Sequence, residues 1–442
     1  MPFLFSSCGS SRKAHSGRRK APISVTPDNN PPVSEKEVEV IDTAVWTEIP
    51  DAEANPVTSP KEGDLKYRSE LKSLYNIAMF APFRANNVIK GAEITNGYKR
   101  FIDFYLGMKL AAKALELDGV SLNVKVFDTE YDDAILQKEL NDPFLEVADV
   151  IIGPYKRANV KSTIEFARRK QKTMVSPWIS SNTLATENPY YVQIKPSLTR
   201  HYTAIRDHII NSELVQNTVF VCKEGEAEKW KELRDIFSLS PDSENNIPFF
   251  SDTLFISPDS LGPESTVFVN LLESKENPVL FIPYPSSQDE DFVYTLLRKL
   301  NIDKGEKELI LYGPGTWVAY RDAVLDLFNT LDIRLSISNL YLPSDERFKA
   351  LRTSFFNDFG TNMSSDAIEG FDLMYYIGRS LKENGTYFHA FPSSLPWELN
   401  QSGFDIRPVT LSHLEDDIRI DFYENFYIQI MEYTDFQFIK IP

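Results

Sequence analysis

Hydroxyl, amide and aromatic side chains gather just after predicted buried strands of this 442-residue chain. Such groups offer neutral hydrogen bonds and flat apolar walls, which suit a small polar or sugar-like ligand. The candidate ligand-binding residues are Tyr155, Trp178, Ser180, Ser181, Asn182, Tyr284 and Trp317. Because ligands of open α/β sheets bind outside the carboxyl ends of the strands, we expect these residues to line one cleft.

Several of these residues also have an ordinary structural explanation. Residues 180–182 could cap the helix that follows them, because Ser and Asn are preferred at that position. Trp178 could pack at the end of its strand. Beside them, Lys156 and Arg157 could lie exposed at the start of a helix, or hold a carboxylate or phosphate there.

Residue patterns typical of catalysis do not occur in the sequence. The five histidines show no metal-ligand spacing such as H-E-x-x-H, and Cys222 has no partner close to it in the sequence. There is no P-loop and no G-x-S-x-G motif. We therefore predict that the protein is not an enzyme, with no catalytic residue, no metal and no cofactor. His201 and His208 share one face of a predicted helix at 200–211, where we expect them on the surface.

The charge balance argues against a nucleic-acid partner. The chain carries 64 acidic and 47 basic residues, a net charge of −17, whereas phosphate contacts need clustered Lys and Arg. The dense basic run within residues 12–20 is interpreted as a solvated or membrane-proximal tail. No apolar run approaches the ~20 residues of a membrane-spanning helix.

Residues 1–8 resemble the end of a bacterial lipoprotein signal. Small residues stand directly before Cys8, and apolar residues stand before those, in the order Met-Pro-Phe-Leu-Phe-Ser-Ser-Cys. This stretch is too short for a secretory signal, so we expect the signal to start upstream and Cys8 to carry the lipid. The alternative is a cysteine in a disordered tail. The prediction places the protein in the periplasm or cell envelope, lipid-anchored to a bacterial membrane.

A disordered linker is predicted after the cysteine, over residues 9–71. Residues 21–65 contain seven prolines and many acids but no sustained apolar periodicity. Such a stretch cannot bury enough surface to offset the entropy lost on ordering the chain. We expect it to act as a tether between Cys8 and the folded body.

Two series of short apolar runs follow, and helical patterns separate the runs. The first series is 75–80, 122–128, 149–154, 173–178 and 190–196; the second is 218–223, 251–257, 278–283, 308–312 and 335–342. The clearest helix is predicted at 101–117, where apolar residues recur at helical spacing before Gly119. Apolar strands that alternate with helices indicate parallel sheets covered on both faces. The predicted fold class is α/β, with two doubly wound parallel-sheet lobes.

Four segments of this body carry a resemblance to a known family. They are YNIAMFAPF with FYLGMKLAAKAL, VADVIIGPYKRANV, TMVSPWISSNTL, and SSDAIEGFDLMYYIGRSLKENG. In order and spacing they resemble the type I periplasmic-binding-protein superfamily, in particular branched-chain amino-acid binding proteins and LppC-like lipoproteins. The resemblance implies three crossovers between the lobes. Lobe one is then expected at 72–196 plus 344–396, and lobe two at 197–343 plus 397–442.

The resemblance also implies a function. It is that of an extracytoplasmic solute-binding lipoprotein, whose lobes close about a hinge on a small polar ligand, amino acid-like or other, for ABC-type uptake or sensing. The partner would then be a membrane permease. The alternative is an envelope lipoprotein that acts by protein contact, such as a regulator of peptidoglycan synthesis with a cell-wall synthase as its partner.

Individual positions match the family only in part. Ser180 falls where the family's hydroxyl follows its Ser-Pro pair, and Tyr284 falls where lobe two of the family places an aromatic. The family's serine-rich loop is replaced by Tyr155–Ala158, and its acid after the Gly-Pro pair is replaced by Gly315. Without that carboxylate a ligand ammonium would be buried unpaired, at a cost of several kcal/mol. Binding of a free amino acid is therefore in doubt.

Overall fold

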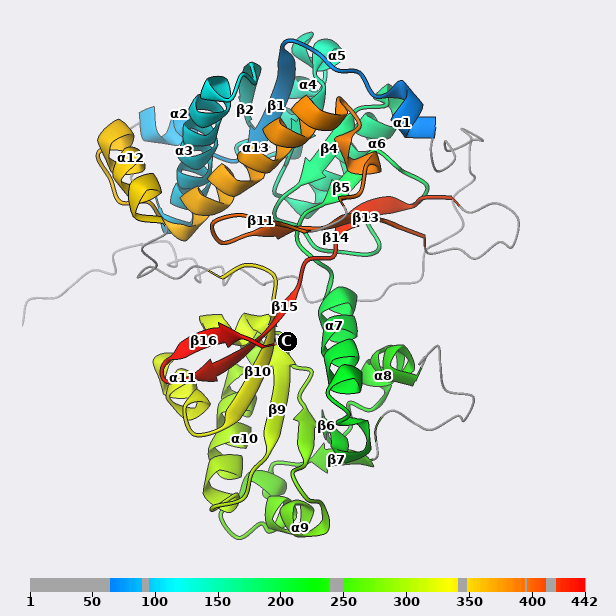
Figure 1. Cartoon of the computed structure of the whole chain (residues 1–442), viewed down its shortest axis with the longest axis vertical. Helices are drawn as coiled ribbons and strands as arrows, with labels where there is room; N and C mark the ends of the chain where they lie inside the picture. The colour runs from blue at the N-terminus through cyan, green and yellow to red at the C-terminus, as the bar shows by residue number, and fades with distance from the viewer. Residues whose placement is uncertain are drawn as a thin grey trace, which may run out of the picture. The chain divides into compact units, whose positions relative to one another are not determined.

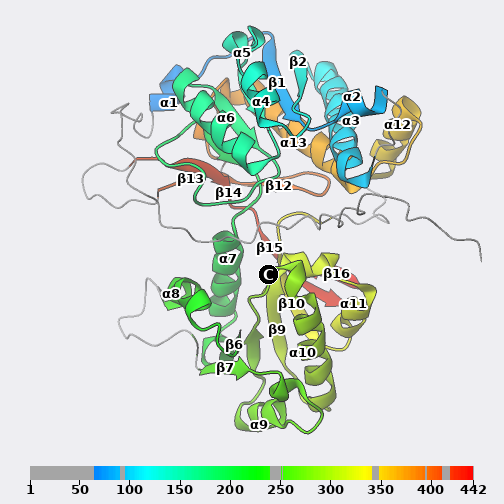
Figure 2. The same ribbon diagram turned by 180° about the vertical axis from the view of Figure 1, so that it is seen from behind.

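The computed structural model describes residues 64–89, 95–238, 250, 252–340, 348–393, 396–410 and 419–441 (Figures 1 and 2). These residues form two seven-stranded sheets with helices packed on them, and a short two-stranded ribbon. The predicted signal remnant, Cys8 and most of the predicted linker lie outside the described residues. Among the described helices, none combines the length and the hydrophobicity that a membrane span requires.

The sheet of lobe one has the strand order β13-β14-β5-β4-β3-β1-β2. Its strands are β1 (Tyr75–Ala81), β2 (Leu122–Asp128), β3 (Val150–Ile152), β4 (Thr173–Ser176), β5 (Tyr191–Gln193), β13 (Ile406–Val409) and β14 (Phe422–Asn425). Neighbouring strands pair in parallel, except that β13 runs antiparallel to β14 at the edge. The first predicted series of strands is thus confirmed as a parallel sheet.

Alternate residues of these strands enter two core layers. Ile77 and Met79 of β1 pack with α3 (Asn96–Leu117) and α13 (Ser365–Asn384). Ala78 and Phe80 pack on the other face, with α6 (Arg157–Lys170). A strand buried on both faces must be apolar throughout, and that pattern is what predicted it. The remaining helices and strands of lobe one are α1 (Asp64–Arg68), α2 (Ala85–Ile89), α4 (Asp133–Glu139), α5 (Phe144–Val147), α12 (Lys349–Phe359), β11 (Trp397–Glu398) and β12 (Gly403–Phe404).

Helices α3 and α13 approach each other backbone to backbone. A Cβ added to Gly107 of α3 would lie 1.8 Å from the carbonyl oxygen of Ala367. A Cβ added to Gly370 of α13 would lie 2.0 Å from the carbonyl oxygen of Phe104. Both helices therefore need glycine where they cross, and the crossing joins two segments of lobe one that are far apart in sequence.

The sheet of lobe two has the strand order β16-β15-β10-β9-β8-β6-β7. Its strands are β6 (Thr218–Lys223), β7 (Asp252–Ile256), β8 (Val279–Phe281), β9 (Ile310–Pro314), β10 (Asp332–Ile337), β15 (Gln429–Thr434) and β16 (Gln437–Lys440). Strands β6 to β10 are parallel, which confirms the second predicted series, and β15 and β16 extend the sheet in antiparallel fashion. The helices are α7 (Leu198–Asn211), α8 (Lys231–Ser238), α9 (Val267–Ser274), α10 (Glu290–Asp303) and α11 (Asp322–Phe328).

The chain passes between the two sheets three times, as the resemblance implied. The first crossover follows β5 at residues 194–197, the second begins after β10 at residue 338, and the third follows β14 at residues 426–428. The third differs from our prediction, because β13 and β14 were expected in lobe two and pair in the sheet of lobe one. Pro408 obscured β13 in the sequence, since proline is tolerated only at sheet edges and bulges.

The folded part of lobe one begins before Lys72. Residues 64–71, which we predicted as linker, form α1 and a segment that docks on lobe one. The Leu65 side chain is 2% exposed, and the Ser69 hydroxyl donates a hydrogen bond to the carbonyl oxygen of Asn384 at 2.5 Å. This part of the linker prediction is wrong, because one buried leucine and hydrogen bonds to a distant segment leave no local pattern in the sequence.

The two histidines of α7 face the sheet of lobe two, so our prediction of surface positions is wrong. His201 Nδ1 lies 3.0 Å from the carbonyl oxygen of Ser336 in β10. His208 Nδ1 lies 2.7 Å from the hydroxyl of Tyr312 in β9. Burial lowers the pKa of His201 to about 4. The helical spacing of the two residues was correct, but it marks the packed face of α7.

Candidate ligand-binding site

Aromatic side chains meet at the carboxyl edge of the sheet of lobe one. Tyr155 follows β3 and Trp178 follows β4, and their ring centroids are 6.1 Å apart. Both rings stand edge-on to Phe101 of α3, at 4.9 and 5.3 Å. Trp178 is only 8% exposed, whereas Tyr155 is half-buried. Packing at the strand end is therefore the main role of Trp178, and Tyr155 offers the more accessible ring.

Two cations lie beside these rings, each with an acidic neighbour: Arg100 lies over Tyr155, and Lys156 lies over the adjacent Tyr131. The guanidinium carbon of Arg100 lies 5.7 Å from the Tyr155 ring centroid, and Arg100 Nε lies 3.7 Å from an oxygen of Asp366. Lys156 Nζ lies 2.8 Å from Asp133 Oδ1. Burial raises the pKa of the Asp366 carboxyl group. The carboxyl edge of lobe one thus combines the apolar surface of aromatic rings with two cations whose charge is partly neutralised by Asp366 and Asp133.

Helix α6 begins at the same edge. Its N-cap residue, Lys156, makes no side-chain capping hydrogen bond. Arg157, the first residue of the helix, donates to the hydroxyls of Ser181 at 3.3 Å and Thr183 at 3.4 Å. The backbone N–H groups at a helix start favour anions, and an adjacent guanidinium adds to that preference. We call the surface formed by Tyr155, Arg157, Trp178 and Ser181 the rim of lobe one.

The neighbouring polar residues are bonded to the chain that follows β5. The Ser180 hydroxyl donates to the carbonyl oxygen of Pro196 at 2.8 Å, and Asn182 Nδ2 donates to Thr199 Oγ1 at 3.0 Å. The N-cap of α7 is Ser197. The capping explanation is therefore wrong for Ser180 and Asn182. Ser180 instead ties the rim to the first crossover, and Asn182 ties it to the first turn of α7.

The two candidates of lobe two lie inside its core. Tyr284 and Trp317 are both 0% exposed. Trp317 Nε1 donates to the carbonyl oxygen of Tyr284 at 2.9 Å, and the Tyr284 hydroxyl accepts from the backbone N–H of Lys223 at 2.6 Å. The Trp317 ring occupies the space beside Gly313, where a Cβ would come within 2.7 Å of it. The structure does not bring these two residues to the rim of lobe one.

Gly315 stands where the type I periplasmic binding proteins that this chain resembles have an acid. The surroundings of Gly315 explain why no acid occurs here. A Cβ added to Gly315 would lie 2.3 Å from the carbonyl oxygen of Ser336 in β10. No side chain fits at this position unless the backbone moves. The carboxylate that would pair with a ligand ammonium is therefore sterically excluded here.

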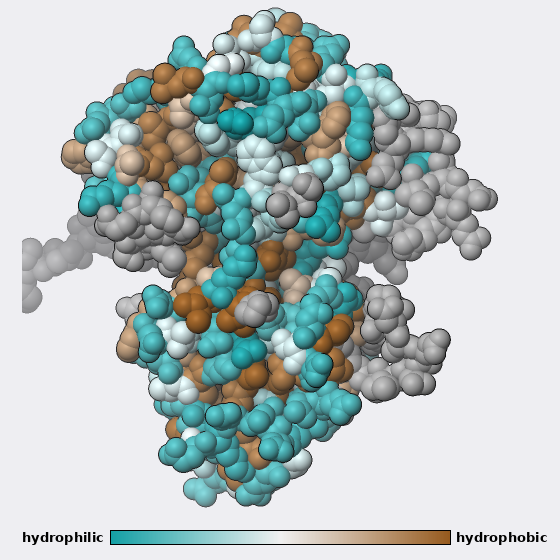
Figure 3. All heavy atoms as spheres, viewed as in Figure 1, coloured by the Kyte–Doolittle hydropathy of each residue, from teal (hydrophilic) through white to brown (hydrophobic). Residues whose placement is uncertain are grey.

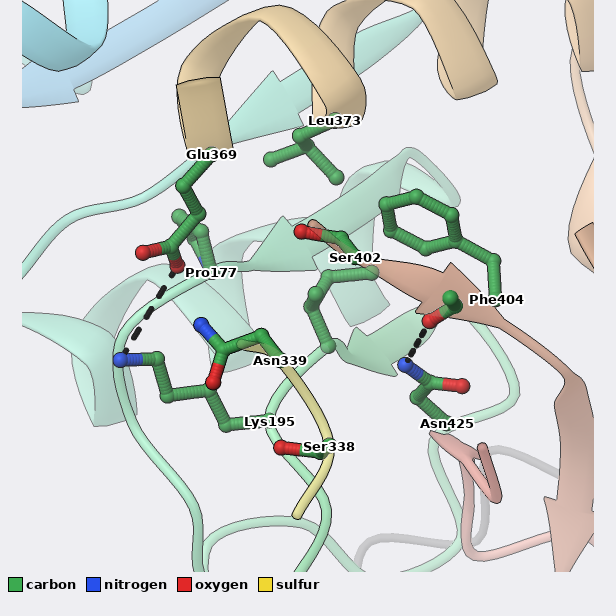
Figure 4. Close-up of a pocket in the computed structure, with 11 residues that line it drawn as sticks. Pro177, Lys195, Ser338, Asn339, Glu369, Leu373, Ser402, Phe404 and Asn425 are labelled. Carbon is green, nitrogen blue, oxygen red and sulfur yellow. Dashed lines mark hydrogen bonds and ion pairs between the residues drawn. The ribbon is translucent and has the colours of Figure 1, made fainter. Parts of the chain in front are cut away.

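The three crossovers come together around a small cavity (Figure 4). Lys195 of the first crossover, Asn339 of the second and Asn425 before the third all line it. Lys195 Nζ lies 3.9 Å from Glu369 Oε1 of α13 across this space. The cavity has a volume of about 20 Å³. One water needs roughly 10–15 Å³ on the same measure, so the cavity holds about one water and is too small for a solute.

A buried carboxylate joins the first and third crossovers. Glu424 of β14 is 1% exposed. Its Oε1 accepts a hydrogen bond from the backbone N–H of Ser197 at 2.6 Å, and its Oε2 accepts one from Arg200 Nε at 3.1 Å. The carboxylate lies at the start of α7, where the helix dipole favours negative charge. One side chain of lobe one thus fixes the first turn of a lobe-two helix.

A second buried carboxylate holds the second crossover through a loop. Asp372 of α13 accepts hydrogen bonds from the backbone N–H groups of Gln401 at 2.9 Å and Ser402 at 3.0 Å. That loop pairs with the crossover, since Asn339 bridges to Ser402 and the Leu340 N–H donates to the Gln401 carbonyl oxygen at 3.2 Å. Burial raises the pKa of Asp372 to about 6, against the hydrogen bonds that it accepts. Sequence reasoning identified neither Asp372 nor Glu424.

Metal-ligating side chains do not cluster in the described part of the chain. No group of three or more His, Cys, Asp or Glu side chains there could hold a metal ion. Cys222 is buried in β6. The rim of lobe one remains the candidate ligand-binding site, and Glu424 and Asp372 are the buried carboxylates that hold the crossovers.

Two seven-stranded, mainly parallel sheets joined by three crossovers define the class: the chain has the fold of the type I periplasmic binding proteins. Residues 105–275 match a family model described as the receptor family ligand binding region. No curated protein matches the chain by sequence.

Solved structures of bacterial proteins share this fold. A protein from Rhodospirillum rubrum described as a branched-chain amino acid ABC transporter is 11% identical, with a TM-score of 0.56 over 83% of this chain and 100% of that one. An ABC transporter substrate-binding protein from Desulfitobacterium hafniense is 14% identical, with a TM-score of 0.51 over 83% of this chain and 100% of that one. Full-length LpoA from Haemophilus influenzae is 10% identical, with a TM-score of 0.51 over 86% of this chain and 61% of that one. At such identities the similarity concerns the fold alone.

Proposed function

We propose that this protein is an extracytoplasmic solute-binding protein, whose two lobes close on a small polar ligand that carries a carboxylate or a similar anion. The observation that carries the proposal is the convergence of Tyr155, Arg157 and Ser181 at the carboxyl edge of lobe one, at the start of α6. Ligands of open α/β sheets bind at that edge. The fold shared with ABC transporter substrate-binding proteins supports a role in uptake or sensing, with a membrane permease as the partner.

The rim favours an anion over a zwitterion. Arg157 and the N–H groups of α6 supply positive charge, the Ser181 hydroxyl supplies a further hydrogen bond, and Tyr155 supplies an apolar wall. Gly315 leaves no carboxylate where an ammonium would be paired. An unpaired ammonium inside a closed cleft costs several kcal/mol, so a ligand without that group binds at lower cost.

A thermal-shift screen of carboxylates, amino acids, short peptides and sugars tests this function. A compound present at ~100 times its Kd should stabilise the protein by ~2.7 kcal/mol. Arg157→Ala should then weaken binding by roughly tenfold or more, because hydrogen bonds to charged groups contribute about 1.5–3 kcal/mol. Lys161→Ala, at an exposed position of the same helix, is the matched control and should bind normally. Unchanged binding by Arg157→Ala would place the ligand elsewhere.

We also propose that Cys8 carries a lipid that anchors the protein to a bacterial membrane. Expressed with a complete signal, the protein should incorporate labelled palmitate and sediment with membranes. Cys8→Ser should lose the label and leave the membranes at high salt as a folded protein with an unchanged melting temperature. Cys222→Ala should keep the label, because that thiol is 0% exposed. Palmitate labelling of Cys8→Ser, or membrane binding of Cys8→Ser that resists high salt, would refute the anchor.

Regulation of peptidoglycan synthesis by protein contact is the second candidate function. It is supported by the buried positions of Tyr284 and Trp317 and by the steric exclusion of an acid at Gly315, since these remove contacts expected for a solute in lobe two. A pull-down from a native envelope distinguishes the two candidates. Recovery of a cell-wall synthase, together with no stabilisation by any small compound, would favour the regulator; recovery of permeases alone would exclude it.

A further inference from the structure

The segment that leads into β1 is fixed on lobe one, and we call residues 64–74 the strap. Its backbone exchanges hydrogen bonds with Thr386, and Ser69 binds the carbonyl oxygen of Asn384. Lys72 Nζ donates to Asp149 Oδ1 at 2.7 Å, directly before β3. Because the strap is held at several points, the side chains that it exposes also have a fixed place.

Large apolar side chains are exposed along the strap and beside it. Tyr67 is 92% exposed, Leu71 70% and Leu74 47%. Val147 of α5 is 56% exposed, and its carbonyl oxygen accepts a hydrogen bond from the side chain of Asn76, just after the strap. Figure 3 shows hydrophobic residues at the surface over α5. Large apolar side chains exposed on one segment of the surface are typical of contact surfaces.

Basic residues surround these apolar side chains. The C-terminal end of α6 adjoins the strap, since Arg68 donates to Gln171 Oε1 at 3.0 Å and Lys172 donates to the Glu146 carbonyl oxygen at 2.9 Å. We call residues 64–74, 144–149 and 168–173 together the strap face. These segments contain seven Lys and Arg and four Asp and Glu, a net charge of +3 in a chain whose net charge is −17. Glu187, outside these segments, lies 3.9 Å from Arg168 and offsets part of that charge. The strap face is thus a moderately positive, partly apolar area on an acidic protein.

The positive charge and the exposed apolar side chains of the strap face suit an anionic partner with an apolar interior. Asp64 is preceded by 63 residues, so this part of the chain joins the folded body at the strap face. The face lies at the amino ends of β1, β3 and β4, which is the edge opposite the rim of lobe one. We infer that the strap face docks on an anionic phospholipid bilayer, with the apolar side chains at the level of the headgroups and the cations on the phosphates. This docking is independent of the proposed ligand.

Vesicle binding by the full chain tests the inference. The test variant carries Cys8→Ser, and serine also replaces the basic residues Arg12, Lys13, Arg18, Arg19 and Lys20. Neither a lipid nor the basic run can then contribute to vesicle binding. This variant should sediment with vesicles of phosphatidylglycerol and phosphatidylcholine, and less with phosphatidylcholine alone or at high salt. Lys66→Glu with Arg169→Glu should weaken binding by at least about tenfold. Tyr67→Ser with Leu71→Ser should also weaken it.

Matched controls come from lobe two. Lys231→Glu and Ile302→Ser change exposed residues away from the strap face and should bind as before. A polarity-sensitive dye on Leu71→Cys should shift to the blue on anionic vesicles, and the same dye on Ile302→Cys should not. Cys222 is buried and stays unlabelled in the folded protein.

Three results would overturn the inference. The first is equal binding by the strap variants and the lobe-two controls. The second is loss of all vesicle binding when the basic run alone is replaced, which would assign binding to that run. The third is a concentration-dependent dimer that Leu71→Ser weakens, without vesicle binding, which would show that a second copy covers the face.

Discussion

Gly370→Ala should lower the free energy of unfolding by about 3 kcal/mol or prevent lobe one from folding, because overpacking a close backbone contact costs about 1–3 kcal/mol and sometimes more. The added Cβ would lie 2.0 Å from the carbonyl oxygen of Phe104, an atom of the helix backbone that has no rotamer to change. Gly107→Ala should act in the same direction from the partner helix. Urea unfolding followed by circular dichroism measures both effects.

The control for this prediction is Glu116→Ala, at an exposed position of α3. Alanine is at least as good a helix former as glutamate, so this variant should unfold within about 0.5 kcal/mol of the parent. If Gly370→Ala is as stable as Glu116→Ala, the backbones of the two helices lie further apart than the 2.0 Å approach requires.

Glu424→Ala should destabilise the protein by about 3 kcal/mol, because removing one partner of a buried ion pair typically costs about 3–5 kcal/mol and Arg200 is partly exposed. The change also leaves the buried N–H of Ser197 without its acceptor. Since Glu424 links β14 to the start of α7, the variant should in addition sample a wider range of lobe orientations. Chemical unfolding measures the first effect, and small-angle scattering measures the second.

Two substitutions make this prediction specific. Glu424→Gln keeps an acceptor for the Ser197 N–H and should lose less stability than Glu424→Ala. Glu383→Ala removes the acid of an exposed ion pair with Arg379 and should change stability by less than about 1 kcal/mol. An unaltered scattering profile for Glu424→Ala would show that this carboxylate stabilises lobe one without restraining the hinge.

The sequence predicted the parallel strands because both faces of each are buried. The run Thr218–Lys223 was predicted with the bounds that β6 has, and the same holds for β2. Strand β14 was not predicted, since it contains Glu424, and an acid in a short segment is usually exposed. Only the partners supplied by residues 193–200, more than 200 positions earlier, make its burial favourable. Long-range compensation of this kind leaves no local pattern.

The rim of lobe one was predicted better than the residues of lobe two, for a similar reason. A residue that follows a parallel strand must lie at the carboxyl edge, and Tyr155, Trp178 and Ser181 do so. Position along a strand does not determine where a side chain points, however. Trp317 turns back over Gly313 into the core, because the missing side chain there leaves room for its ring. The sequence contains both residues, but only the folded backbone brings them into contact.

Neither lobe is continuous in sequence, and this affects when the protein can fold. Until residues 422–425 have been synthesised, β5 has an unpaired edge, and until residues 365–384 have been synthesised, the core side of α3 has no cover from α13. Domains ordinarily fold in order as they emerge from the ribosome, but here the first sheet waits for a strand encoded near the end of the chain. Lobe one therefore cannot complete its sheet or its core until almost the whole chain has been synthesised. Late completion of lobe one is an advantage for any protein that crosses a membrane as an extended chain. It also lengthens the time during which unpaired strand edges need protection from aggregation.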